Sequence, residues 1–179
     1  MSDSVARTDS GAVRGVSGVW KGIPFAAPPR GDLRFAAPVR PEPWDGVRDA
    51  LEFGPAVPQP SPAPGVPTWF DADRGFDWLT VNVWSPDPGR GARLPVMVWL
   101  HGGGWRIGWP GMPQYDGATL AGHGVVVVTV AYRLGHEGFR DVPAGAAVGV
   151  APACRSDGRF QSPAARLRPA LRGHAPCLD

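Results

Sequence analysis

The sequence predicts an α/β fold, and three features of its middle part indicate this class. Residues 94–100 and 125–130 are nearly continuous apolar runs, typical of strands that are covered on both faces of a sheet. Between them, residues 115–121 can form a short helix that ends at Gly122 or Gly124. Strand, loop, short helix and strand in this order favour a sheet with helical connections.

Shorter strands are predicted upstream of these runs. Residues 79–84 alternate with a period of two, as a strand does. The chain up to about residue 67 is dense in proline and glycine, and its apolar stretches at 13–16 and 19–25 resemble brief strands joined by turns. We therefore expect an N-terminal antiparallel β ribbon followed by a few strands of a central sheet.

Composition limits the classes of function. The 179 residues are 43% hydrophobic and carry a net charge of +2, and no basic segment is interleaved with aromatic residues as in nucleic-acid-binding proteins. The N-terminal segment is polar and charged, so we expect neither a signal peptide nor a membrane anchor, and a cytoplasmic location. The cysteines, Cys154 and Cys177, indicate neither a disulfide framework nor a metal site. No cofactor is implied.

Residues 140–179 differ in kind from the rest. They combine alanine, arginine, proline and glycine without a period of two or 3.6. We expect this tail to be disordered or to be translated from a shifted reading frame, and the folded part to comprise residues 1–139. If the frame is shifted, another frame of the encoding DNA contains the continuation of the protein.

The strongest functional signal is the point where the run 94–100 ends in His101, Gly102, Gly103 and Gly104. A strand brings the chain to the edge of a sheet, and residues without side chains let a substrate oxygen approach backbone N–H groups closely. A phosphate-binding loop is disfavoured, because neither G-x-G-x-x-G nor Gly-Lys-Ser/Thr is present here. A plain strand-ending turn is the remaining alternative.

Several segments, in order, resemble the type-B carboxylesterases, a family that includes bacterial esterases and cholinesterases. The segments are 18–35, 43–50, 53–55, 79–86, 101–105, 115–117 and 125–135. The resemblance implies an incomplete α/β-hydrolase fold. It also implies a small-molecule carboxylic ester as the substrate of the complete enzyme, with no nucleic-acid or membrane partner.

By this resemblance, each residue of the glycine loop has an expected role. Gly103 and Gly104 would form the oxyanion hole with their N–H groups, and the third donor would follow the serine nucleophile. His101 and Gly102 would support the loop, His101 by hydrogen bonding rather than as a catalytic base. The loop is thus expected to bind the negative charge that develops during ester hydrolysis.

Tryptophans surround this loop in the sequence. Trp84 and Trp99 stand in predicted strands and are expected in the core. Trp105 and Trp109 could line the mouth of a pocket or could simply pack, and the sequence leaves both open.

The chain also departs from the family at a few positions. The family often has one cysteine where this chain has Val57 and another where it has Trp78. A disulfide needs both cysteines, so the replacement of both together is consistent with a chain that lacks this disulfide. Ala131 replaces an asparagine that usually precedes Tyr-Arg-Leu-Gly, which removes a local source of hydrogen bonds.

No catalytic residue is assigned. A serine esterase needs a nucleophile, a histidine base and an orienting carboxylate, and none of the eight serines here lies in Gly-x-Ser-x-Gly. Ser17 comes closest to this motif, but Val19 stands where the motif has its last glycine.

The first interpretation of the function is an N-terminal fragment of a serine carboxylesterase that is inactive alone. The alternative is a non-catalytic remnant or binding module on the same scaffold.

Overall fold

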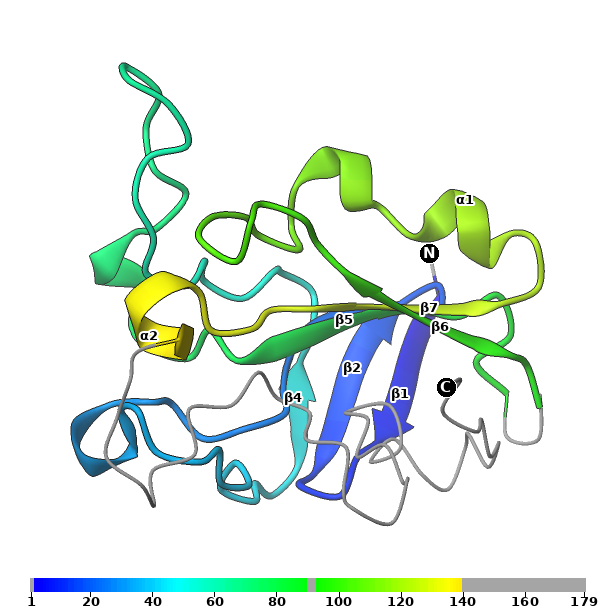
Figure 1. The fold of residues 1–179 in the computed structure, drawn as a ribbon. Coiled ribbons are helices and arrows are strands. Elements are labelled where there is room, and N and C mark those ends of the chain that lie inside the picture. Colours follow the sequence, from blue (N-terminus) through cyan, green and yellow to red (C-terminus); the bar gives the residue numbers. More distant parts are fainter. Residues whose placement is uncertain (1, 90–92, 140–179) are drawn as a thin grey trace, which may run out of the picture.

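The computed structural model describes residues 2–89 and 93–139. Its strands and helices are β1 (Asp3–Arg7), β2 (Ala12–Val16), β3 (Val19–Pro24), η1 (Gly31–Leu33), β4 (Val47–Asp49), η2 (Ala72–Arg74), β5 (Thr80–Trp84), β6 (Val96–Leu100), η3 (Pro113–Tyr115), α1 (Ala118–Ala121), β7 (Val126–Val130) and α2 (Gly135–Phe139). The described strands form one twisted sheet in the order β1-β2-β3-β5-β7-β6, with β4 paired to β2 (Figure 1).

The N-terminal ribbon is present but it is not separate from the main sheet. Strands β1 and β2 pair antiparallel, and β2 meets β3 at a tight turn in which Val16 lies opposite Val19. Strand β3 then pairs antiparallel with β5, which joins the ribbon to the rest. Strand β4 pairs parallel with β2. The sequence did not indicate β1 or β4, because their residues are mostly polar and exposed.

Strands β5 and β7 form the buried centre of the sheet. They pair antiparallel, and all five residues of each are buried. The polar members are satisfied inside: the Asn82 Nδ2 donates to the Thr129 Oγ1 at 2.9 Å, and the Asn82 Oδ1 accepts from the Gly22 N–H at 2.9 Å. These bonds link β3, β5 and β7 without leaving an unpaired amide.

The prediction that both apolar runs are covered on both faces is confirmed for β7 and wrong for β6. Strand β6 pairs parallel with β7 on one side, and it is the last strand in the order, so no described strand pairs with its outer edge. Val96, Trp99 and Leu100 are accordingly 39–42% exposed. Trp84 is in the core as predicted, at 2% exposure, and the same prediction for Trp99 is wrong.

The short helix predicted at 115–121 is divided into two. A single turn, η3, ends at Tyr115, and α1 begins at Ala118, whose N–H donates to the Asp116 side chain at 2.8 Å. Helix α1 ends at Gly122, one of the two predicted positions. Both turns lie over the same side of the sheet (Figure 1).

The predictions for residues 140–179, including the two cysteines, lie outside the described residues. Within the described ranges, no helix is long and apolar enough to cross a membrane. The same ranges contain no group of three or more His, Cys, Asp or Glu residues placed to hold a metal ion.

Candidate functional site

The candidate site is the loop that follows β6. His101 is buried, with 3% exposure, whereas Gly102, Gly103 and Gly104 lie on the surface. The loop is therefore anchored by its first side chain and exposes the backbone of the three glycines.

One hydrogen bond orients the peptide between Gly102 and Gly103. The Nδ1 of His101 lies 2.9 Å from the carbonyl oxygen of Gly102, and because a carbonyl can only accept, the imidazole donates from Nδ1. In a trans peptide, the C=O and the following N–H point in opposite directions. The bond to His101 therefore turns the Gly103 N–H away from the imidazole.

A second set of bonds orients the next peptide. The carbonyl of Gly103 accepts from the N–H groups of Arg106 and Ile107, both at 3.2 Å. By the same geometry, the Gly104 N–H points away from this turn. Among the described residues, no acceptor receives the N–H of Gly103 or Gly104. Two neighbouring donors are thus free to bind an external oxygen.

The backbone of this loop requires glycine at its centre. Gly103 has φ +124°, and a Cβ there would lie 1.9 Å from the carbonyl oxygen of Ile107. Gly104 has φ +61°. Trp105 also adopts φ +61°, which costs a non-glycine residue about 1 kcal/mol. The carbonyl of Trp105 accepts from the Gly135 N–H at 2.7 Å, which helps to hold this conformation.

His101 is held by two tyrosines. Its ring stacks on Tyr132 at 4.4 Å and faces Tyr115 at 6.3 Å, and the Tyr132 hydroxyl donates to the His101 carbonyl. Burial lowers the pKa of His101 below its ordinary value of 6.5, against the raising effect of the bond to Gly102. Burial also raises the pKa of Tyr132, with a smaller contribution from Tyr115. A neutral imidazole that donates from Nδ1 fits a supporting role.

The far end of the loop is clamped by Gln59. Its Oε1 accepts from the Gly108 N–H at 2.7 Å, and its Nε2 donates to the Gly108 carbonyl at 2.9 Å and to the Val57 carbonyl at 3.0 Å. A Cβ on Gly108 would lie 2.2 Å from the His101 Nδ1, so the two ends of the loop pack closely. The sequence did not predict a role for Gln59, whose one local signal is the Pro-Gln pair that follows Val57.

The two tryptophans of the loop behave differently. Trp109 packs: its Nε1 donates to the Gly54 carbonyl at 3.1 Å, and its ring meets Phe53 edge-on at 5.8 Å. Trp105 is 51% exposed, and its ring contacts Tyr132 at 5.7 Å and Phe139 at 5.8 Å. A place at the mouth of a pocket stays a prediction for Trp105.

The segment that supports His101 is itself fixed in the core. Val57 and Trp78 are each 1% exposed and share one hydrophobic cluster with Ala131 and Tyr132. The side chain of Arg133 donates to a backbone carbonyl at 2.7 Å and is buried. Val57 and Trp78 thus pack in the same cluster as Tyr132, whose ring stacks on His101.

An ion pair adds to this support. The Arg34 Nη2 and the Glu137 Oε1 are 2.5 Å apart, and the Arg34 Nε lies 3.1 Å from both carboxylate oxygens. The pair joins α2 to the N-terminal part of the chain.

The sequence matches the carboxylesterase family over residues 2–149. The chain belongs to the carboxylesterase family. It is 46% identical over 145 residues to the para-nitrobenzyl esterase of Bacillus subtilis (strain 168), covering 78% of this chain and 29% of that protein. It is 44% identical over 149 residues to the fumonisin B1 esterase of Sphingopyxis macrogoltabida, covering 78% and 26%.

Solved structures agree with this assignment. A PNB esterase structure superposes with a TM-score of 0.67 at 42% identity, over 79% of this chain and 30% of that one. A carboxylesterase of Geobacillus stearothermophilus superposes with a TM-score of 0.65 at 42% identity, over 76% and 28%. This carboxylesterase chain therefore has the strands of a partial α/β-hydrolase sheet, and it spans less than a third of the length of these relatives.

Proposed function

We propose that this carboxylesterase chain supplies two of the oxyanion donors for the hydrolysis of a small-molecule carboxylic ester. The observation that carries the proposal is the pair of free N–H groups at Gly103 and Gly104, each in a peptide whose carbonyl is held on the opposite side by a hydrogen bond. Donors held in place before the reaction stabilise the transition state without reorganisation. His101 and Gly102 act as the support of this loop.

The 179 residues are not expected to hydrolyse esters by themselves. One oxyanion donor is worth about 10²- to 10³-fold in rate, whereas loss of a nucleophile and its base costs about 10⁶-fold in a well-studied protease. This sequence contains no Gly-x-Ser-x-Gly. The proposal therefore places the nucleophile, acid and histidine of the complete serine esterase outside these 179 residues. A cytoplasmic location stays a prediction.

The absence of that motif also favours a second candidate, a non-catalytic remnant or binding module on the same scaffold. Both candidates expect no turnover of p-nitrophenyl acetate by the chain above a heat-denatured control. They differ in binding. The dimethylphosphinate anion resembles a tetrahedral oxyanion, and we expect it to bind the wild-type chain and to bind Gly103→Ala at least tenfold more weakly, by saturation-transfer difference NMR.

Equal binding by the two proteins would reject the oxyanion proposal and leave the second candidate. Measurable turnover that depends on the folded chain would reject both accounts. Gly31→Ala is the matched control, because Gly31 also has a positive φ, +55°, but lies outside the loop.

A further inference from the structure

A charged side chain stands close to the two free donors. Arg106 follows Gly104 by two residues, so their Cα atoms are at most about 7 Å apart. Its backbone N–H is used in the bond to the Gly103 carbonyl, which fixes the start of its side chain within the same turn. The arginine is therefore part of the loop that presents Gly103 and Gly104.

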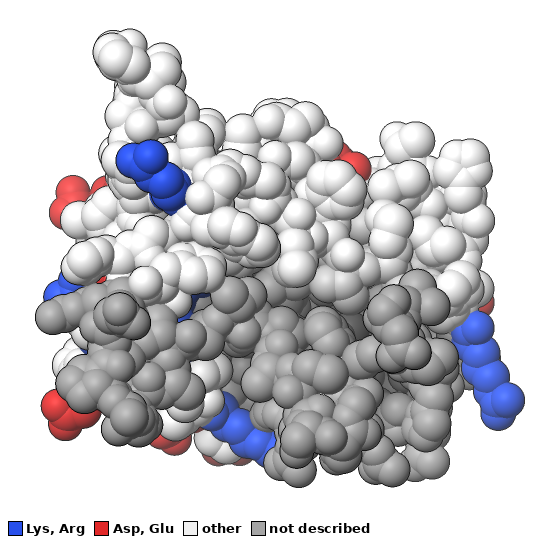
Figure 2. Space-filling view, in the orientation of Figure 1, with Lys and Arg blue, Asp and Glu red and all other residues white. Residues whose placement is uncertain are grey.

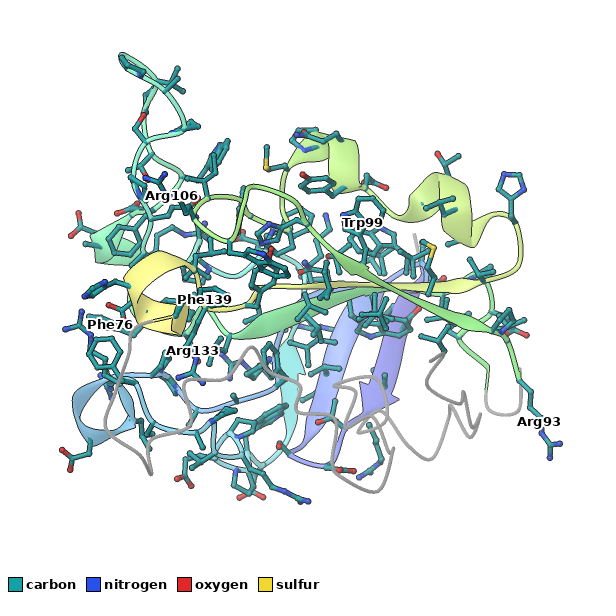
Figure 3. The ribbon with its side chains drawn as sticks, in the orientation of Figure 1. Phe76, Arg93, Trp99, Arg106, Arg133 and Phe139 are labelled. Carbon is teal, nitrogen blue, oxygen red and sulfur yellow. The ribbon has the colours of Figure 1, made fainter. Side chains whose placement is uncertain are left out.

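The guanidinium of Arg106 makes no hydrogen bond, ion pair or ring contact with any described residue, and the residue is exposed. Other arginines are used within the fold: Arg14 pairs with Asp49 at 2.6 Å, and Arg34 pairs with Glu137. Figure 3 places Arg106 on the loop near the Phe139 end of the molecule, and the surrounding surface in Figure 2 is mostly uncharged. The positive charge is thus available to a ligand.

We infer that Arg106 is a specificity-determining residue that selects esters carrying a carboxylate near the scissile bond. Arginine matches a carboxylate with two parallel N–H donors. Exposed Trp105, next to it, offers an apolar surface for the carbon chain between the two groups. The preferred substrate class is a mono-ester of a short dicarboxylic acid. This inference rests on the proposed function, since it needs the ester carbonyl at Gly103 and Gly104.

The test compares monomethyl glutarate with dimethyl glutarate, which differ in one negative charge. Saturation-transfer difference NMR on the full chain observes the small ligand directly and needs no turnover. We expect the mono-ester to bind more tightly than the diester by up to about fivefold, the upper end of the range for an exposed ion pair. Added salt should reduce this preference, because it screens exposed charges.

Arg106→Gln should abolish the preference, and Arg106→Lys should keep part of it. Arg93→Gln is the matched control, because Arg93 is also exposed, has no recorded partner among the described residues and lies at the opposite end of the molecule (Figure 3). Equal binding of the two esters, or a preference that survives Arg106→Gln, would overturn the inference alone. Absence of binding by both esters would overturn the inference too, whereas the proposed function fails only if dimethylphosphinate binds wild type and Gly103→Ala equally.

Discussion

Gly103 is the residue on which the geometry of the loop depends most. Its φ of +124° disfavours any side chain, and a Cβ would lie 1.9 Å from the carbonyl oxygen of Ile107. We expect Gly103→Ala to lower the free energy of unfolding by about 2 to 4 kcal/mol, the sum of backbone strain and overlap. Urea denaturation measures it.

Gly31→Ala separates the two contributions. Gly31 has φ +55° and no atom within 4 Å of its Cβ position, so that change should cost only about 1 kcal/mol. Equal losses in the two variants would show that the contact with Ile107 has no energetic weight.

His101 makes stability depend on pH. Burial lowers its pKa below 6.5, so between the folded-state pKa and 6.5 the unfolded chain binds more protons than the folded chain. Its contribution is complete above about pH 6.5 and is lost as the pH falls through the folded-state pKa. The advantage of wild type over His101→Gln in urea should therefore shrink between pH 7.5 and pH 5.

His123→Gln, the same change at an exposed histidine, controls for the substitution itself. A difference between wild type and His101→Gln that stays constant between pH 7.5 and pH 5 would contradict a buried neutral imidazole.

At the scale of elements, Gln59 couples the segment before η2 to the loop after β6. Three hydrogen bonds from one amide hold Gly108 and Val57. We expect Gln59→Ala to cost about 2 kcal/mol, since it leaves polar backbone groups without partners. Amide hydrogen exchange across 103–109 should accelerate. Gln114→Ala should change neither quantity, because the Gln114 amide makes one weak contact, with the Met112 sulfur at 3.9 Å.

The elements differ in how far local sequence predicts them. Strands β2, β3, β5 and β7 carry apolar residues at strand spacing, so their existence and the end of α1 at Gly122 were predictable. The exposure of β6 was not, because its composition equals that of a buried strand and only the strand order places it at an edge.

The site was predictable in part for the same reason. The three consecutive glycines after β6 predict an exposed backbone from the local sequence alone. The partners that hold it are distant in sequence: Gln59 stands 49 residues before Gly108, and Tyr132 stands 31 residues after His101. A local sequence pattern does not predict contacts between residues so far apart. The resemblance to the carboxylesterases identified the segments that contain these residues, but not the contacts between them.

At the scale of the molecule, β6 leaves an apolar edge on the described part of the sheet. Unpaired strand edges with exposed apolar residues favour association between chains. We expect the chain to self-associate with rising concentration in analytical ultracentrifugation, and Val96→Lys to reduce this. Val5→Lys is the matched control, because Val5 lies on the opposite edge strand, where polar residues alternate. Equal effects of the two lysines would refute a role for β6.

The most direct test of the central claim observes the two donors themselves. In a ¹⁵N-labelled sample titrated with dimethylphosphinate, the amide resonances of Gly103 and Gly104 should move together and saturate at one affinity, while those of Gly31 and Gly124 stay in place. Unchanged Gly103 and Gly104 resonances at saturating anion, or equal shifts at all four glycines, would contradict the assignment of this loop as an oxyanion-binding site.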